Sequence, residues 1–384
     1  MSNSVARAIV QDCFAVPEET KGTAVYPTTT AHRIVTAGTA DINQQASFSD
    51  SEEIANSLDI LERFQDQMGA GSWSVPMYIK LSGTLGTAPM GGVLIESLMG
   101  DEVIDSGASV SYIQKTEKPS FTLWVKKSHT VFFASGCCCE AGKLNFNNKG
   151  GSHFDMSGGF MRMGWAGVSA LTAAATAKTV VVENSKLFTP GAYVAFGAGT
   201  ADADTNTGAG YKIASIAYAT DTLTMVDDIT QDSGAVIKGY LPTLAAVGTV
   251  LENKNLVISF DGTPKKLKSL GVDINSPVAW QTDEITSTGY TEEYIEDRRS
   301  IKLSLDVLFR EQDLTYFYDA TQNTKVAIIA VNNGGTAGNV CTINVPYSEL
   351  EVPSVTTSMP TVSLSIAGTG LGSAGEDSCS IVFT

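Results

Sequence analysis

One tract of the chain has the residue types and spacing of a calcium-binding loop. In Asp202-Ala203-Asp204-Thr205-Asn206-Thr207-Gly208, oxygen-bearing side chains recur at alternate positions. A loop that holds Ca²⁺ needs glycine at its sixth position and a bidentate glutamate at its twelfth. Thr207 and Ile213 stand at those two positions. The tract is therefore predicted to be an Asp/Gly loop rather than a metal site.

Nucleophile and thiol chemistry are also disfavoured. The three histidines are His32, His129 and His153, and none belongs to a Gly-x-Ser-x-Gly or related nucleophile motif. The cysteines include the run Cys137-Cys138-Cys139, whose side chains would alternate between the two faces of a strand and could not converge on zinc. With no CxxC pair and no signal peptide, the cysteines are expected to be reduced, mostly buried thiols of a protein made in a cytosol.

Charged and glycine-rich runs complete the candidate chemistry. Acidic runs at Asp50 to Glu53 and Glu292 to Asp297 could supply paired catalytic carboxylates, but their similar placement favours equivalent surface or interface segments. No Lys-Ser/Thr follows the glycines that could make a phosphate loop, which are Gly197, Gly199, Gly208 and Gly210. Solvated turns explain the basic clusters Lys126-Lys127 and Lys265-Lys266-Lys268; the remaining basic pair is Arg298-Arg299. The sequence thus predicts no catalytic, cofactor or metal site and no enzyme.

The charge balance of the chain restricts its partners. Among 384 residues, 25 Lys plus Arg stand against 41 Asp plus Glu, a formal net charge of −16. Non-specific DNA binding depends on cations that release phosphate counterions, so this balance disfavours a nucleic-acid reader. It is compatible with a surface past which DNA slides without sticking. No apolar run is long enough to span a membrane.

A pattern of residues occurs twice in the chain. Asp41-Ile42-Asn43 recurs as Asp273-Ile274-Asn275, and an acidic stretch ending in Arg follows each copy. Both copies then enter β-patterned segments, Trp73 to Leu81 and Ile301 to Phe309. Later, Phe154 to Gly158 matches Leu364 to Gly368 in residue type. This order of elements predicts a repeated fold within one chain.

The pattern divides the chain into four parts. Residues 1–40 are polar and Thr-rich and are predicted to form an extended arm with little core of its own. Residues 41–167 and 249–384 are mainly β-patterned and hold the two copies. Between them, residues 168–248 carry five short apolar stretches separated by turns, which predicts an inserted small β-barrel. These stretches are Thr179 to Val182, Tyr193 to Phe196, Lys212 to Ile216, Thr222 to Val226 and Ala235 to Lys238.

Further strands and short helices are expected within the two copies. The strand candidates are Ser109 to Gln114, Phe121 to Val125, Thr130 to Ala134, Lys143 to Phe146, Leu256 to Phe260, Lys325 to Val331, Asn339 to Val345, Thr361 to Ile366 and Ser378 to Phe383. Gly92 to Met99 and Glu311 to Ala320 are predicted helices at similar places in the two copies. Glu52 to Met68 fits a helix or a strand, and the pattern does not separate them.

Several of these segments resemble the tail tube proteins of long-tailed bacteriophages. The resemblance covers most of the chain outside residues 1–40 and the insert, and it lies in a strand pattern rather than an active-site signature. Its segments are Gly71 to Gly83, Gly86 to Pro89, Leu94 to Gly100, Thr130 to Gly136, Lys143 to Phe146, Phe154 to Gly158, Gly338 to Val340, Val345-Pro346 and Asp377 to Phe383.

The resemblance implies a fold and a set of partners. The fold would be a β-sandwich with a flanking helix, whose strands join those of neighbours around a DNA conduit. Family members commonly form six-membered rings, so two copies per chain imply a trimeric ring of pseudo-sixfold symmetry, or else a hexamer. The implied partners are further copies of the chain, the tape-measure protein, transiting DNA and other tail proteins, in a virion tail assembled in the host cytoplasm. The insert is expected to lie outside the channel.

Two other classes of function stay open at this point. A β-rich capsid decoration protein or host-binding adhesin, with the insert binding a host glycan, is the first. A β-rich hydrolase is the second, although no nucleophile, base and orienting residue can be assembled from the sequence.

Overall fold

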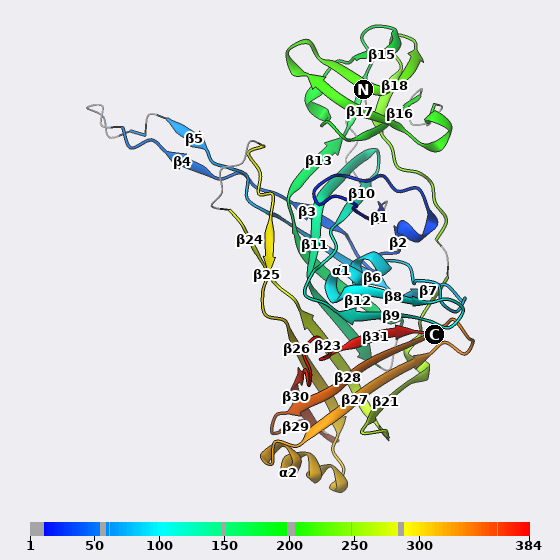
Figure 1. Ribbon diagram of the computed structural model, residues 1–384, viewed down its shortest axis with the longest axis vertical. Coiled ribbons are helices and arrows are strands. Elements are labelled where there is room, and N and C mark those ends of the chain that lie inside the picture. The colour runs from blue at the N-terminus through cyan, green and yellow to red at the C-terminus, as the bar shows by residue number, and fades with distance from the viewer. Residues whose placement is uncertain are drawn as a thin grey trace.

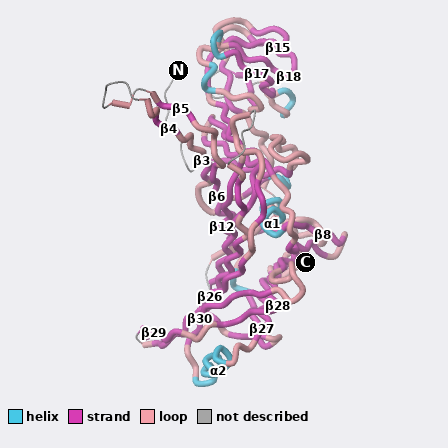
Figure 2. The backbone as a smooth tube through the Cα atoms, turned by 60° about the vertical axis from the view of Figure 1, so that its left-hand side comes forward, coloured by secondary structure: helices cyan, strands magenta, loops and turns pink. Residues whose placement is uncertain are grey.

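The computed structural model describes residues 11–53, 59–60, 62–147, 150–197, 204–246, 248–282, 288–358 and 360–384. The fold is mainly β, as the sequence predicts, with antiparallel strand pairing throughout the named sheets. The molecule is long, with the insert at one end, the first copy in the middle and the second copy at the other end (Figure 1). Sheets run along its length, while the two α-helices lie beside them (Figure 2).

The first copy contains the elements from β1 to β13. Its strands are β1 (Gln11–Pro17), β2 (Arg33–Ile34), β3 (Asp41–Asn43), β4 (Phe48–Asp50), β5 (Arg63–Gln65), β6 (Gly71–Tyr78), β7 (Lys80–Leu81), β8 (Gly100–Asp105), β9 (Ser109–Gln114), β10 (Phe121–Lys127), β11 (Thr130–Asn147), β12 (His153–Phe160) and β13 (Arg162–Ala166). Helix α1 (Gly92–Met99) follows β7 at the predicted residues.

The second copy contains the elements from β21 to β31. Its strands are β21 (Leu256–Phe260), β22 (Thr263–Lys265), β23 (Leu267–Asn275), β24 (Val278–Trp280), β25 (Tyr294–Glu296), β26 (Ser300–Leu308), β27 (Lys325–Asn333), β28 (Val340–Leu350), β29 (Ser354–Ser358), β30 (Thr361–Leu371) and β31 (Ser380–Phe383). The predicted helix near Glu311 is a 3₁₀ turn, Glu311–Leu314, that continues into α2 (Thr315–Thr321).

The two copies share their strand pairing, residue for residue, around one central strand. In the first copy β6 pairs with β12, and Trp73 lies opposite Gly158. In the second copy β26 pairs with β30, and Leu303 lies opposite Gly368. On the other side of these strands, β6 pairs with β3 and β26 pairs with β23. Equal pairing on both sides makes Trp73 and Leu303 equivalent positions.

A shared irregularity extends this equivalence to the β10–β11 hairpin of the first copy and the β27–β28 hairpin of the second. The β10–β11 pairing slips between Phe121 and Leu123, which lie opposite Cys137 and Ala134. The β27–β28 pairing slips in the same way between Val326 and Ile328, opposite Ser348 and Val345. A bulge kinks a strand at a fixed position, so its recurrence marks a repeated backbone rather than a repeated composition. The long β11 of the first copy corresponds to β28 plus β29 of the second, interrupted near Pro353.

The sequence match between the copies is displaced at one strand. Asp41 lies opposite Ser74 in β6, and the position opposite the equivalent Ser304 of β26 is Gly271, not Asp273. The Asp-Ile-Asn identity therefore matches two equivalent strands, β3 and β23, but with an error of two residues in their alignment. A shift of two keeps each side chain on its own face of the sheet, so the hydrophobic pattern could not reveal it.

The prediction that residues 1–40 form an arm with little core of its own is wrong for the described residues from Gln11 onward. Strand β1 pairs with β10, and Cys13, Phe14, Ala15 and Val16 are all buried. It occupies the place that β21 takes beside β27 in the second copy. Four adjacent apolar residues are typical of a short strand that is buried on both faces. The prediction missed this strand because polar segments on both sides of it dominate the composition of residues 1–40. Residues 1–10 lie outside the described part of the chain.

Within its described residues, the segment Glu52 to Met68 contains a short strand, β5 (Arg63–Gln65), and no helix. Strands β4 and β5 pair as an antiparallel hairpin, with Phe48 opposite Gln65 and Asp50 opposite Arg63. Residues 54–58 and 61, which include part of the helical pattern, lie outside the described residues. Of the helically spaced apolar residues, Phe64 and Met68 are described, and Phe64 is exposed; Ile60, which fits the strand alternation, is exposed as well.

The insert is a sheet of six strands, one more than the sequence suggested. They are β14 (Val168–Ala170), β15 (Ala175–Val181), β16 (Tyr193–Gly197), β17 (Tyr211–Ala217), β18 (Thr222–Gln231) and β19 (Val236–Gly239). Thr172 N donates to Val181 O and Glu183 N to Ala170 O, so the two end strands of the sheet are tied together. The insert shares a hydrophobic cluster with Phe14, Trp124 and Phe133 of the first copy. The chain then returns through β20 (Thr249–Val250), which pairs with β7.

All six cysteines are buried and unpaired, as predicted. Burial raises the pKa of Cys13, Cys139, Cys341 and Cys379 to about 12 in each case. A thiol with such a pKa is almost entirely protonated at neutral pH and is a poor nucleophile or metal ligand. These residues serve as small core side chains.

Helix α1 carries a carboxyl group that should make stability depend on pH. Burial, helped by Glu102 and Asp101, raises the pKa of Glu96 to about 7. Because the folded-state pKa lies above the unfolded value, Glu96 favours folding at low pH, and this contribution is lost as pH rises through about 7. We expect Glu96→Gln to raise the free energy of unfolding by about 1 kcal/mol at pH 8.5, after allowance for solvent screening.

The expected result is a difference in melting temperature between Glu96→Gln and the wild type that increases with pH. Thermal unfolding of the wild type and Glu96→Gln between pH 5.5 and 8.5 measures it. A constant difference in melting temperature across that range would contradict the assignment.

Candidate functional site

The main feature of the molecule is one sheet that continues through both copies. Strand pairs given by the register place its eight strands in the order β3, β6, β12, β11, β23, β26, β30 and β29. We call this the continuous sheet. Its first four strands belong to the first copy and its last four to the second.

The copies meet where β11 pairs with β23 in the middle of the continuous sheet. Leu144 lies opposite Val272, and both side chains are only 1% exposed. Nearby, Lys118 Nζ donates to Cys139 O of the first copy, at 2.9 Å, and to Ser276 O of the second. Burial lowers the pKa of Lys118, and the two carbonyl groups compensate part of that cost. Strand pairing and a buried lysine thus join the copies.

The two outer strands of the continuous sheet each have one open side. Within the described part of the chain, β3 pairs only with β6, and β29 pairs only with β30. A strand with one partner presents a row of backbone donors and acceptors that another strand can use. The continuous sheet therefore ends in two open edges.

The backbone pattern shows which residues point their polar groups outward at these edges. Ala37 N donates to Pro76 O, so the even-numbered residues of β6 direct their backbone N–H and C=O groups toward β3. Asp41 and Asn43, which lie opposite Ser74 and Ser72, therefore direct their own backbone groups inward, toward β6. Ile42 then directs its amide and carbonyl to the open edge. At β29, Phe309 N donates to Val362 O and Glu351 N to Ala367 O. By the same alternation, Val355, opposite Leu364, directs its backbone groups outward.

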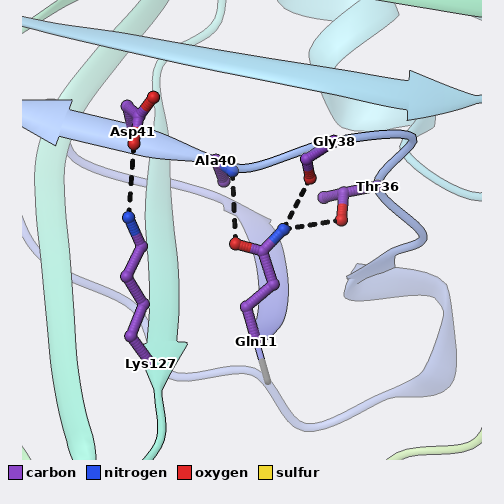
Figure 3. A network of polar contacts seen from close by, with 6 residues as sticks. All are labelled: Gln11, Thr36, Gly38, Ala40, Asp41 and Lys127. Atoms are coloured by element: carbon purple, nitrogen blue, oxygen red, sulfur yellow. Dashed lines mark hydrogen bonds and ion pairs between the residues drawn. The ribbon is translucent and has the colours of Figure 1, made fainter. Parts of the chain in front are cut away.

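A side chain covers the β3 edge just before Ile42. The Gln11 amide accepts a hydrogen bond from Ala40 N at 3.2 Å and donates to Gly38 O at 2.7 Å and Thr36 Oγ1 at 2.8 Å (Figure 3). Lys127 Nζ lies 3.2 Å from Asp41 Oδ1 beside this network (Figure 3). Gln11 thereby satisfies Gly38 O and Ala40 N and leaves the open part of the edge to begin at Ile42.

The continuous sheet has one apolar face and one polar face. Trp73, Val75, Phe154, Val272 and Leu305 lie on the apolar face and are buried in the main hydrophobic core. The polar face carries mostly small side chains from the alternate positions of the same strands. They include Ser72, Ser74, Ser157, Asn145, Ser269, Ser304, Ser365 and Thr369.

Charges on the polar face are mixed rather than uniformly acidic. Asp155 and Asp273 lie opposite Lys143 in the two neighbouring strands, and Lys143 Nζ is 3.6 Å from Asp273 Oδ1. Lys302 lies opposite Asp273 on its other side. The acidic surplus of the chain is therefore not concentrated on this face, and its lysines lie beside aspartates.

The hairpins β4–β5 and β24–β25 leave the continuous sheet at equivalent places but have different surroundings. Each follows the strand that pairs with β6 or β26. The β24–β25 hairpin packs on the first copy, where Tyr294 is 5% exposed. The β4–β5 hairpin projects away from the body of the molecule (Figure 1), and Phe48 and Phe64 are 50% and 54% exposed.

Where the structure describes them, the residues singled out for chemistry do not form one site. Both oxygens of Asp204 are occupied, since Tyr211 Oη, Asn206 N and Gln231 Nε2 donate to them. Asp202 and Ala203, like Gly199, lie outside the described residues. His32, whose pKa is lowered by burial, ends the 3₁₀ turn Thr30–His32, and His153, 3.8 Å from Asp155, begins β12. Among the residues that the structure describes, no group of three or more His, Cys, Asp or Glu could hold a metal ion.

The charged runs have structural surroundings. Asp50 Oδ1 pairs with Arg63 Nε at 2.8 Å within the β4–β5 hairpin, and Thr288 donates to Glu292 in the other hairpin. Arg299 donates to Ser276 Oγ and Lys115 O, and Lys268 to Ser363 Oγ. Sequence reasoning placed the acidic runs at equivalent segments of the two copies.

The open edges at Ile42 and Val355 could not be identified from the sequence. An open edge is defined by which strands pair, and the sequence does not show that pairing.

None of the helices in the described residues is both long and apolar enough to cross a lipid bilayer. Neither the protein-family models nor the curated proteins with which the sequence was compared give a match.

Proposed function

We propose that the protein is the structural subunit of a bacteriophage tail tube, whose copies close into rings that stack into a hollow conduit for DNA. The continuous sheet with an open edge at each end is the observation that carries this proposal. Side-by-side pairing of identical chains through these edges would remove both edges at once, which is the thermodynamic reason for ring closure.

The size of the sheet fits a channel of useful width. Three chains of eight strands each would close a barrel of 24 strands. With neighbouring strands about 4.8 Å apart and tilted by about 40°, the backbone would enclose a cylinder roughly 45–50 Å across. After allowance for side chains, such a channel would admit duplex DNA. Two equivalent copies per chain give this trimeric ring pseudo-sixfold symmetry.

The polar face supports the same proposal if it lines the channel. Small uncharged side chains and lysines balanced by aspartates offer DNA few strong cationic contacts, so phosphates would not be held in place. The mechanism does not need a strongly acidic lumen. The tape-measure protein would occupy this channel before DNA, and the virion tail would be the location.

Electron microscopy of the purified protein tests the proposal. Rings or stacked tubes with threefold symmetry and a pseudo-sixfold outline are expected, and mass photometry should detect trimers or their multiples. Particles that stay monomeric across protein concentrations and salt conditions would contradict it. Glycan binding by such a monomer would favour the adhesin class instead.

A further inference from the structure

We infer that the junction between the two copies is the template for the junction between chains: β29 of one chain pairs antiparallel with β3 of the next, with Val355 opposite Ile42. In the same contact, the β4–β5 hairpin of the second chain lies on the second copy of the first. This inference rests on the proposed function and specifies its interface.

The register follows from equivalent positions on the two sides of the internal junction. Leu144 in β11 lies opposite Phe154, and Val355 in β29 lies opposite Leu364. Phe154 and Leu364 are equivalent, because they lie opposite Met77 and Val307 in the central strands. Val355 is therefore the counterpart of Leu144.

The same reasoning applies to the partner strand. Val272 lies opposite Leu303, and Ile42 lies opposite Trp73. Since Trp73 and Leu303 are equivalent, Ile42 is the counterpart of Val272. The internal pair Leu144 and Val272 then translates into the pair Val355 and Ile42 between chains. Both of these residues direct their backbone groups to the open edges, as a bonded antiparallel pair requires.

The exposure of the counterparts shows what the junction would bury. Leu144 and Val272 are each 1% exposed, whereas Val355 is 59% exposed and Ile42 is only partly buried. The apolar side chains at the two open edges thus occupy positions whose counterparts are buried at the internal junction. Covering them with a second copy of this chain removes that exposed area from water.

The hairpins provide an independent argument for the same arrangement. Where β23 joins β11, the β24–β25 hairpin that follows β23 packs on the first copy. Trp280 Nε1 donates to Glu140 Oε1 at 3.0 Å, and Tyr294 Oη to Lys118 O at 3.3 Å. The equivalent hairpin after β3 has no such cover in the described residues, and both its phenylalanines are exposed.

The second copy has an apolar site where that hairpin would arrive. Tyr294 packs in a cluster with Met161, which follows β12. The counterpart of Met161 is Leu371 at the end of β30, and Tyr347, directly opposite it in β28, is 40% exposed. Phe48 and Phe64 of the neighbouring chain would contact this pair.

Intermolecular disulfides test the register. If Val355 lies opposite Ile42, then Ser354 lies opposite Asn43 as a close, non-bonded pair whose side chains share the polar face. We expect Ser354→Cys mixed with Asn43→Cys to give cross-linked dimers under mild oxidation, and the double variant to give a closed, cross-linked ring. Background from the native cysteines is low because all six are buried.

Two matched variants make the result specific. Asn43→Cys with Val355→Cys places the thiols on opposite faces and should not cross-link. Ser354→Cys with Asp41→Cys would cross-link best if the Asp-Ile-Asn match, rather than the strand pairing, set the register. Preferential cross-linking of that second pair would overturn the inference.

Microscopy of the same samples separates the inference from the proposed function. Rings without the Ser354–Asn43 cross-link would reject this junction and leave the tube proposal standing, whereas absence of any assembly in the wild type would reject the tube. As a second readout, Phe48→Ser with Phe64→Ser should weaken ring formation without lowering the melting temperature of the subunit. Unchanged ring formation would reject the hairpin contact.

Discussion

Replacing Val355 by proline is expected to abolish ring formation while the isolated subunit stays folded. Proline lacks the N–H that Val355 directs to the open edge of the continuous sheet, but it is tolerated on an edge strand whose N–H faces solvent. The inward bonds of β29 to β30 use the neighbouring residues and should persist. A cost of about 3 kcal/mol per junction lowers its association constant roughly 100-fold, and a ring has several junctions.

Sedimentation velocity and electron microscopy measure the loss of rings, and thermal unfolding checks the subunit. Ile42→Pro is the matched variant on the opposite edge and should also prevent rings, although it removes some core packing. An equimolar mixture of the two variants retains one intact β3 edge and one intact β29 edge, so it should form dimers and nothing larger. Rings from Val355→Pro alone would show that β29 is not an assembly edge.

Gly158→Ala is expected to destabilise the fold by more than about 3 kcal/mol. A Cβ at Gly158 would lie 2.0 Å from Cys138 O and 2.9 Å from Glu140 N, both backbone atoms of the bulged part of β11. Backbone cannot yield as a side-chain end can, so β12 would have to separate from β11. The expected result is a large fall in the denaturant midpoint, or failure to fold.

The equivalent glycine of the second copy provides the control. A Cβ at Gly368 would meet Leu350 Cδ2 at 2.9 Å and Glu349 O at 3.0 Å, contacts that a small shift can relieve. Gly368→Ala should therefore cost about 1–2 kcal/mol, clearly less than Gly158→Ala. Urea unfolding of both variants checks the ranking, and an equal effect would argue against the close approach of β12 to the bulge in β11.

Local patterning predicted most of the secondary structure. The residues of α1, β9 and β21 follow directly from apolar spacing, and so do five of the six described strands of the insert, all but β14. The match of Gly158 with Gly368 was visible in the sequence because each ends a stretch of the same residue types. The first strand, β1, was missed because its four buried residues are surrounded by polar chain, and burial on both faces depends on strands that are distant in sequence.

What the sequence determined by itself was a mainly β chain that contains one fold twice, with an insert between the copies. Only the tertiary structure decided the register between the copies, because a slip of two residues preserves every hydrophobic face. It also decided which strands are open edges. Leu144 and Val355 occupy equivalent positions in the two copies, but β23 covers one of them and no described strand covers the other. Exposure of an edge depends on what lies beside it in space, and the order of residues along a single chain does not encode that directly.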